Sequence, residues 1–225
     1  MIAKIGGAFL YCFSVLVYRT CRFYISGIDQ VELFQEQEVP VIVTSWHGMT
    51  MMIAGFLRKK LDITKFSVIM PDDYRGAALE VFAQKMGADP VPLNLSGDST
   101  LGMGRKLVNL MKKIKAGGHF LIHPDGPAGP AYKVKPGLSF IAQKTGAKIL
   151  PMGCYCRNAY HVPRWDRYTL PLPFSKIHIQ VGSLFSIPKD VSGLDQMNRD
   201  IEDILNRLTV QAAANYYELD DPAIL

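Results

Sequence analysis

His123-Pro124-Asp125-Gly126-Pro127-Ala128-Gly129-Pro130 follows a short apolar run and is the stretch of this 225-residue chain that decides its fold. Three prolines and two glycines in eight residues restrict the backbone and leave the carboxylate of Asp125 on a rigid turn. About 80 residues upstream, a second apolar run ends in Thr44-Ser45-Trp46-His47-Gly48. Enzymes of the α/β class place their chemistry at such strand ends. We therefore expect His47 and Asp125 to be neighbours at one edge of a sheet.

Apolar runs of strand length alternate with segments of helical periodicity along the chain. The predicted strands are 39–45, 66–70, 90–93, 119–122, 148–156 and 176–181. The predicted helices are 4–24, 49–60, 76–86, 101–116, 136–145 and 194–217. This alternation predicts an α/β fold with a mostly parallel central sheet flanked by helices.

Composition limits the classes of partner. Hydrophobic residues make up 48% of the chain, the formal net charge is +5 and the isoelectric point is near 9.0. Such a charge surplus attracts an anionic lipid surface, an acidic carrier protein or nucleic acid. Nucleic-acid binding rests on charge alone, and we expect none. The four cysteines form no pattern at zinc spacing, so we expect reduced thiols and no metal site.

The N-terminus carries an apolar run, 5–18, flanked by Lys4, Arg19 and Arg22. Its 14 residues are fewer than the roughly 18–20 that span a bilayer, so we expect a helix lying in the membrane interface. A cleaved signal peptide is an alternative, but the run has no small-residue cleavage site. A helix that caps the core is the remaining alternative. We accordingly divide the chain into a membrane-associated helix, 1–25, and an α/β domain, 26–225.

His47 is the candidate general base. A histidine at a strand-to-helix junction can deprotonate a hydroxyl when a carboxylate holds its tautomer. The alternative is a packed histidine beside Trp46. Asp125 either braces its turn, faces the site, or does both.

Cations and aromatic residues surround these two blocks in the sequence. Lys133, Lys135 and Arg105 form a candidate cationic rim for a phosphate-bearing lipid or an acidic carrier, with a solvated basic face as the alternative. The segment 165–174 is rich in aromatic residues and proline, so it either roofs an acyl-chain cleft, rests on the bilayer edge, or forms an ordinary loop.

The motifs Ser45-Trp46-His47-Gly48, His123-Pro124-Asp125-Gly126-Pro127 and Ile149-Leu150-Pro151, in this order, resemble the lysophospholipid acyltransferase superfamily over about 23–188. The sequences of 124–130 and of 165–174 more closely resemble one branch of this superfamily. That branch, long labelled a domain of unknown function, includes late acyltransferases of lipid A synthesis. The resemblance implies a glycerol-3-phosphate acyltransferase-like fold.

The chain departs from the family pattern at two places. The family has an acid five or six residues after its histidine, where this chain has Met52 and Ile53. Asp125 is our first substitute. The alternative acids are Asp72 and Asp73. The family's phosphate-binding arginine in the Pro-Glu-Gly region would align near Ala128, and the arginine of its second motif has no match around 93–95. Both departures disfavour a glycerol-3-phosphate-type acceptor.

The resemblance implies an acyltransferase on the cytoplasmic face of the bacterial inner membrane. It would move a fatty acyl group from a thioester of acyl carrier protein or coenzyme A to a lipid hydroxyl, with no tightly bound cofactor. His47 would act as base and Asp125 would orient it. Trp46, Gly126, Lys133, Lys135 and Arg105 would bind substrate, and backbone N–H groups of 126–129 would stabilise an oxyanion.

Two questions stay open at this stage. A lipid A precursor is the first choice of acceptor, and a lysophospholipid of glycerolipid synthesis is the alternative. A non-catalytic lipid-binding homologue is the other alternative, because the acid of the first motif is missing.

Overall fold

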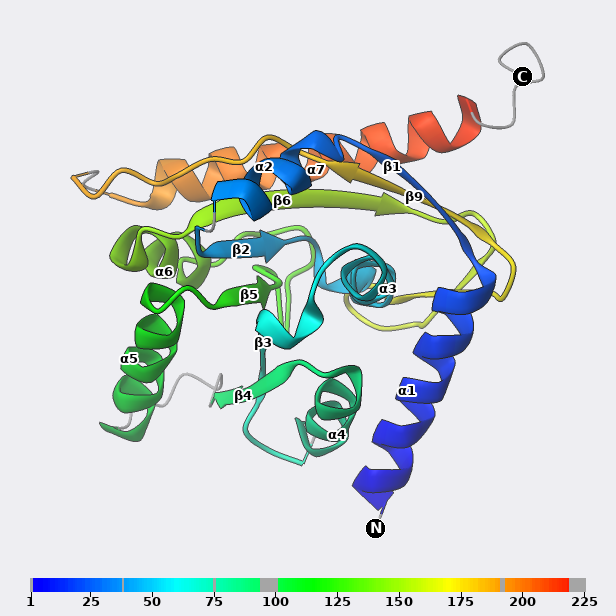
Figure 1. The fold of residues 1–225 in the computed structure, drawn as a ribbon, viewed down its shortest axis with the longest axis horizontal. Coiled ribbons are helices and arrows are strands. Elements are labelled where there is room, and N and C mark those ends of the chain that lie inside the picture. Colours follow the sequence, from blue (N-terminus) through cyan, green and yellow to red (C-terminus); the bar gives the residue numbers. More distant parts are fainter. Residues whose placement is uncertain (1, 38, 75, 94–100, 191–192, 219–225) are drawn as a thin grey trace.

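A seven-stranded sheet flanked by helices forms the centre of the molecule (Figure 1). The structure is a computed structural model that describes residues 2–37, 39–74, 76–93, 101–190 and 193–218. The strand order is β1-β9-β6-β2-β5-β3-β4. These strands are β1 Arg22–Ser26, β2 Val41–Thr44, β3 Phe66–Pro71, β4 Asp89–Leu93, β5 His119–Ile122, β6 Lys148–Tyr155 and β9 Lys176–Val181. The helices are α1 Ile2–Thr20, α2 Asp29–Gln37, α3 Thr50–Lys60, α4 Gly76–Met86, α5 Leu101–Lys115, α6 Gly137–Thr145 and α7 Asp195–Glu218.

Every neighbouring pair in this sheet is parallel except β6 and β9. The predicted α/β class with a mostly parallel sheet is therefore confirmed. The central strand β2 is buried along its whole length, as expected for a strand with neighbours on both edges and helices over it. Thr44 of β2 pairs with Ile122 of β5, so the two carboxyl ends lie side by side. This register brings the His47 and His123 blocks to one edge of the sheet.

The first helix is shorter than the predicted 4–24. It ends at Thr20, and Arg22–Ser26 pairs in parallel with β9 as the edge strand of the sheet. Aromatic and β-branched residues in this segment suit a strand, and pairing satisfies their backbone groups. The expected boundary between 1–25 and 26–225 thus falls inside β1. No helix within the described ranges is both long and apolar enough to cross a bilayer.

Helix α1 packs against α4 and α3. A Cβ at Gly7 would lie 2.6 Å from the carbonyl oxygen of Ala78, so this glycine allows the close approach of α1 and α4. Between β6 and β9 the chain makes a long excursion that includes a small hairpin, β7 Ala159–His161 with β8 Thr169–Pro171. The sequence pattern did not predict this hairpin, because three-residue strands carry no periodicity.

Candidate active site

His47 lies on a short 3₁₀ turn directly after β2. Its Nδ1 is 2.7 Å from Oδ2 of Asp166, a carboxylate whose side chain is fully buried. No hydrogen-bond partner for Nε2 of His47 occurs among the described residues, and the side chain is 24% exposed. An imidazole that donates from Nδ1 to a carboxylate keeps the lone pair of Nε2 available to accept a proton.

Arg164 holds Asp166 from the other side. Its Nε donates to Oδ1 at 2.5 Å and one terminal nitrogen donates to Oδ2 at 2.7 Å. Burial alone would raise the pKa of Asp166, but hydrogen bonds from Arg164 and His47 outweigh it and lower that pKa below its usual range. Asp166 is therefore ionised at neutral pH and can stabilise a positive charge on His47.

Glycines make room for this arrangement. A Cβ at Gly48 would lie 2.3 Å from the carbonyl oxygen of Asp166, and one at Gly126 would lie 2.8 Å from Cδ2 of His47. Gly129 has φ +75°, and its Cβ would lie 2.8 Å from the Trp165 ring. Three loops can thus close on one imidazole only because their backbones carry no side chain at these points.

Aromatic rings enclose the imidazole of His47. Ring centroids of Trp165, His123 and Tyr168 lie 5.4, 5.5 and 6.0 Å from its own. Such packing limits the rotamers of His47 and keeps its Nε2 in one direction.

His123 is a second histidine at the site. Its Nδ1 is 2.9 Å from the carbonyl oxygen of Ser45, and its Nε2 is 3.1 Å from the Thr50 hydroxyl. Burial, and then the nearby charge of His47, lower the pKa of His123 to about 3. His123 is therefore a neutral, hydrogen-bonded partner of the loop that carries His47.

Asp125 does not contact the imidazole, contrary to our expectation. Its Oδ1 accepts from the backbone N–H of His47 at 2.9 Å, and its Oδ2 accepts from the backbone N–H of Tyr132 at 3.4 Å. Both backbone donors face the carboxylate because it sits on a tight turn that ends beside β2. Asp125 braces the two loops, and Asp166 takes the place beside the ring.

The other acids that the sequence offered lie elsewhere. Asp72 forms an ion pair with Lys106 of α5. The backbone carbonyl of Asp73 accepts from Gly76 at the start of α4. Neither carboxylate contacts His47, whose only carboxylate partner among the described residues is Asp166. Met52 and Ile53, at the family's acid positions, are buried in the core on α3.

Of the predicted substrate-binding cations, only Lys135 reaches the site. Its Nζ donates to the carbonyl oxygen of Gly126 at 3.0 Å. Lys133 instead donates to Glu202 of α7 at 2.5 Å, and Arg105 is exposed on α5. Trp46 is buried with its ring edge-on to Tyr132, so it supports the loop and offers no surface to a substrate.

The expected oxyanion donors are mostly used by the turn itself. The N–H of Gly126 donates to the carbonyl of His123 at 3.2 Å, and that of Gly129 donates to Asp125 at 3.1 Å. Pro127 has no N–H. Cationic side chains near the imidazole, Arg164 and Lys135, are the better placed groups for a developing negative charge.

Two cavities with mostly apolar walls meet at His47 and His123. We call the first, of about 340 Å³, the α4 cavity; its walls include Leu10, Met51, Leu57, Phe82, Ala83 and Met86. We call the second, of about 320 Å³, the α6 cavity; its walls include Leu93, Leu107, Leu138, Ile141, Pro127 and Lys135. Ligand pockets usually measure about 300–1,000 Å³. His47 therefore stands between two pockets that each suit an apolar chain.

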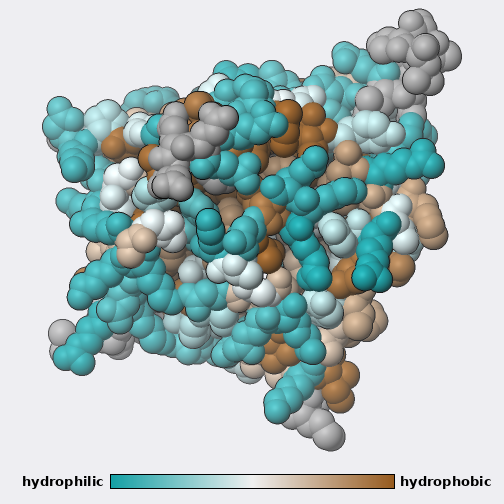
Figure 2. Space-filling view, viewed as in Figure 1, coloured by the Kyte–Doolittle hydropathy of each residue, from teal (hydrophilic) through white to brown (hydrophobic). Residues whose placement is uncertain are grey.

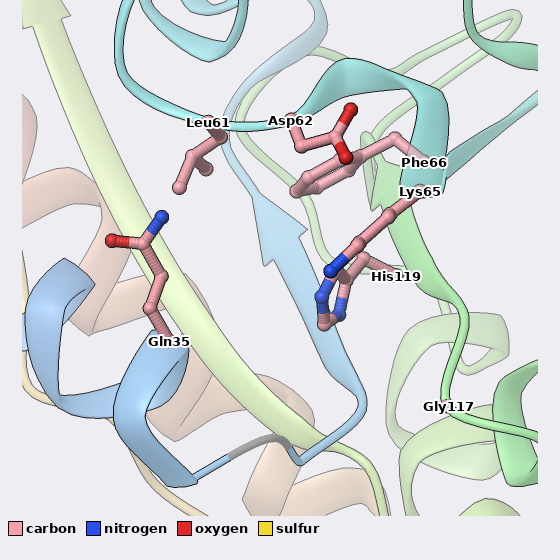
Figure 3. Close-up of a pocket in the computed structure, with 7 residues that line it drawn as sticks. All are labelled: Gln35, Leu61, Asp62, Lys65, Phe66, Gly117 and His119. Carbon is pink, nitrogen blue, oxygen red and sulfur yellow. The ribbon is translucent and has the colours of Figure 1, made fainter.

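A separate hollow lies at the opposite, amino-terminal end of the sheet (Figure 3). It holds Asp62, Lys65 and His119, the residue types of a catalytic site. Asp62, however, caps a short turn by accepting from Thr64, and Nδ1 of His119 accepts from the backbone N–H of Val41. The side chains of Asp62 and His119 thus serve the fold at that end of the sheet.

Comparison with known proteins supports the architecture. No known protein-family model matches the sequence. The uncharacterized protein RP090 of Rickettsia prowazekii (strain Madrid E) is 27% identical over 184 residues, 80% of each chain. The crystal structure of the 1-acyl-sn-glycerophosphate (LPA) acyltransferase PlsC from Thermotoga maritima matches with a TM-score of 0.57. The match covers 93% of this chain and 78% of that one at 18% identity.

The chain has an acyltransferase-like fold. The fold implied by the sequence resemblance is thus confirmed, and the lipid A branch stays a prediction. Asp166 was missed as the partner of His47. The one signal for it was its place in the aromatic segment 165–174, for which a roof over an acyl-chain cleft, a contact with the bilayer edge and an ordinary loop were all open.

Proposed function

We propose that this chain is a membrane-associated acyltransferase that moves a fatty acyl group from a thioester to a lipid hydroxyl. The donor would be acyl carrier protein or coenzyme A. The observation that carries the proposal is the position of His47. Its Nε2 is available, its Nδ1 is held by an ionised carboxylate, and it stands where two apolar cavities meet.

The chemistry needs one base and no covalent enzyme intermediate. Nε2 of His47 takes the proton of the acceptor hydroxyl as its oxygen attacks the thioester carbonyl carbon. Asp166 stabilises the imidazolium that forms, and Arg164 keeps Asp166 ionised. The C–S bond then breaks, and the imidazolium returns the proton to the leaving thiolate. The products are an ester and a free thiol, and the histidine is regenerated.

The two cavities suggest how the substrates divide. We assign the α4 cavity to the acyl chain of the donor, because apolar side chains of α1, α3, α4 and β3 line most of it. We assign the α6 cavity to the acceptor lipid, because Lys135 lies on its wall beside Gly126 and can pair with a phosphate. Both chains would then run to His47, which suits attack by a hydroxyl on a bound thioester.

The acceptor and the location rest on the sequence resemblance. A lipid A precursor is our first choice, and a lysophospholipid of glycerolipid synthesis is the alternative. We place the protein on the cytoplasmic face of the inner membrane, held against an anionic surface by α1. Helix α1 supports this placement with an exposed apolar stripe, formed by Ile5, Phe9 and Leu16.

A non-catalytic lipid-binding role is less well supported. That alternative rested on Met52 standing in the place of the family's acid. The contact between His47 and Asp166 supplies a histidine–carboxylate pair from another part of the chain. A protein that only bound lipid would have no use for an oriented imidazole with an available Nε2.

Acyl transfer by His47→Ala tests the proposal. Membranes containing each variant are supplied with labelled acyl donors and a panel of lipid acceptors. We expect wild-type transfer to fall by about 10²-fold or more in His47→Ala. His161→Ala, at an exposed histidine of β7, is the matched control and should transfer like wild type. Equal transfer by His47→Ala and wild type would refute His47 as base, and no transfer to any acceptor by wild type would favour lipid binding.

A further inference from the structure

We infer that a hollow at the C-terminal end of α1 binds the phosphate of an anionic bilayer lipid, with Phe174 inserted beside it. The hollow measures about 310 Å³ and is lined by Arg22, Arg157, Lys176, Asn158, Phe174 and Tyr216. We call four of these six residues, Arg22, Arg157, Phe174 and Lys176, the Phe174 surface. The inference deepens the proposed function, since it rests on the protein working at a membrane, and it names a site outside the catalytic one.

The charge of the hollow calls for an anion. Arg22 of β1 and Lys176 of β9 are partners in the parallel register, so two cations lie side by side at the sheet edge. Arg157, just beyond β6, adds a third. None of the described lining residues is a carboxylate. A phosphate group in the hollow can accept charge-assisted hydrogen bonds from Arg22 and Arg157.

Phe174 is held outward by a tight turn. Its side chain is 78% exposed, and its backbone has φ +66°, a conformation that is uncommon for an aromatic residue. The turn is fixed because the carbonyl oxygen of Asn158 accepts from the N–H of Leu172 at 2.9 Å and from the Ser175 hydroxyl at 2.8 Å. A strained backbone that presents an apolar ring to solvent points to a function for that ring.

The exposed face of α1 is also apolar. Ile5, Phe9 and Leu16 lie at helical spacing along it and are 63%, 69% and 44% exposed. The opposite face of α1 is packed on α4 and α3, so the helix is apolar on both sides. We expect both faces of such a helix to be buried against apolar groups. In Figure 2, hydrophobic residues gather along the edge of the molecule where α1 lies in Figure 1.

The two apolar parts are physically joined. Sγ of Cys21 donates to the carbonyl oxygen of Leu172 at 3.3 Å, and the N–H of Arg22 donates to that of Ser175 at 2.9 Å. The Phe174 turn is thereby fixed to the end of α1. Apolar side chains with cations among them match a bilayer, whose phosphates lie just outside its hydrocarbon. An acidic carrier protein would match the cations but would leave Phe174 and the α1 stripe uncovered.

Vesicle binding tests the inference without any assay of activity. The full chain is sedimented with vesicles of phosphatidylglycerol or of phosphatidylcholine. We expect strong binding to the anionic vesicles only. Each arginine near a surface contributes about fivefold, so Arg22→Gln with Arg157→Gln should weaken binding about 25-fold. Phe174→Gly, which also relieves the backbone at positive φ, should weaken it about tenfold or more.

Matched variants separate the site from general charge and from misfolding. Arg199→Gln with Arg207→Gln removes two charges from α7 and should leave vesicle binding within about twofold. Arg22→Lys with Arg157→Lys keeps the charge and should retain most of the binding. Wild-type binding by the Gln pair and by Phe174→Gly, or equal binding to neutral vesicles, would overturn the inference. Binding to acyl carrier protein that is lost in the Gln pair, with vesicle binding intact, would assign the hollow to the carrier.

A failure of the proposed acyltransferase function can be distinguished from a failure of this inference. If no acceptor is acylated, the vesicle experiment still reports on the Phe174 surface. If transfer to detergent-dispersed acceptors occurs at the wild-type rate in the Gln pair while vesicle binding is lost, the surface is a membrane site and the catalytic site is independent of it.

Discussion

Nδ1 of His47 lies 2.7 Å from Oδ2 of Asp166, a residue 119 positions further along the chain. The first residue follows the central strand β2, and the second belongs to the excursion between β6 and β9. A histidine and a carboxylate so far apart in sequence meet because Gly48 lets the backbone of Asp166 approach within contact. The pair therefore depends on tertiary structure, and each of its supports can be tested.

Asp166→Asn should remove most of the catalytic rate. The amide no longer stabilises a positive imidazole and permits the wrong tautomer, which in a comparable histidine–carboxylate pair costs about 10⁴-fold in kcat. We expect a fall of about 10²–10⁴-fold with little change in KM, measured as acyl transfer at saturating donor. Asp203→Asn, on the exposed side of α7, is the control. A larger loss in Asp125→Asn than in Asp166→Asn, both variants being folded, would return the role to Asp125.

Arg164→Lys should lower kcat although it keeps the charge. Arg164 makes two hydrogen bonds to the two oxygens of Asp166, which a lysine cannot reproduce. Asp166 would then rotate and hold His47 less well, so we expect kcat to fall about tenfold and KM to stay the same. The measurement is steady-state transfer with one donor and one acceptor. Unchanged kcat in both Arg164→Lys and Arg164→Gln would mean that Arg164 does not position Asp166.

The sequence predicted the parts of the site that follow from strand order. His47 and the turn 123–130 both follow apolar strands, and β2 and β5 are parallel neighbours, so these blocks had to meet. Which carboxylate faces the ring could not be predicted in the same way. Asp125 meets the backbone N–H of His47, and that choice depends on loop directions that no spacing encodes.

The segment from 156 to 175 shows the limit most clearly. Its path is set by contacts with Gly48 and Gly129 and by a hairpin of two three-residue strands. Strands of three residues are too short to show a periodic pattern of apolar residues, so the pattern could not predict this segment. Its aromatic composition was the one sequence feature that marked it. Strand β1 was missed for a related reason. Its apolar residues continue those of α1, and only pairing with β9 identifies them as a strand.

Gly126→Ala should impair catalysis more than folding. Its Cβ would lie 2.8 Å from Cδ2 of His47, so the ring or the turn must shift. A displacement of about 1 Å at a reacting group costs about 10²-fold. We expect that loss in kcat, with the midpoint of thermal unfolding reduced by only a few degrees. Gly104→Ala, where a Cβ would meet nothing within 4 Å, is the matched control and should keep full activity. Full activity of Gly126→Ala would contradict this account.

His123→Gln should flatten the dependence of stability on pH. The pKa of His123 is lowered to about 3, so between the usual histidine value and pH 3 the unfolded chain binds the extra proton. The native state therefore loses stability as pH falls through this window. From pH 6.5 to 5.0 this residue accounts for about 1.5 kcal/mol of that loss.

Urea unfolding at both pH values measures this contribution. The free energy of unfolding should fall by about 1.5 kcal/mol less in His123→Gln than in wild type. His119 and His178, whose pKa values are also lowered by burial, are present in both proteins and cancel in the difference. The same fall in both proteins would show that His123 is protonated as easily in the native state as in the unfolded chain.

Ala83→Phe should shorten the acyl chains that the protein accepts. Ala83 is buried on α4 and lines the α4 cavity, so a larger side chain there takes space from a bound chain. We expect kcat/KM for the longest donors to fall about tenfold or more, while short donors react as before. Leu138→Phe, in the α6 cavity, is the matched variant and should leave donor preference unchanged while weakening the acceptor. If Leu138→Phe rather than Ala83→Phe shortens the accepted donor chains, the donor chain occupies the α6 cavity and the acceptor occupies the α4 cavity. The larger side chain would then limit whichever chain lies in its own cavity.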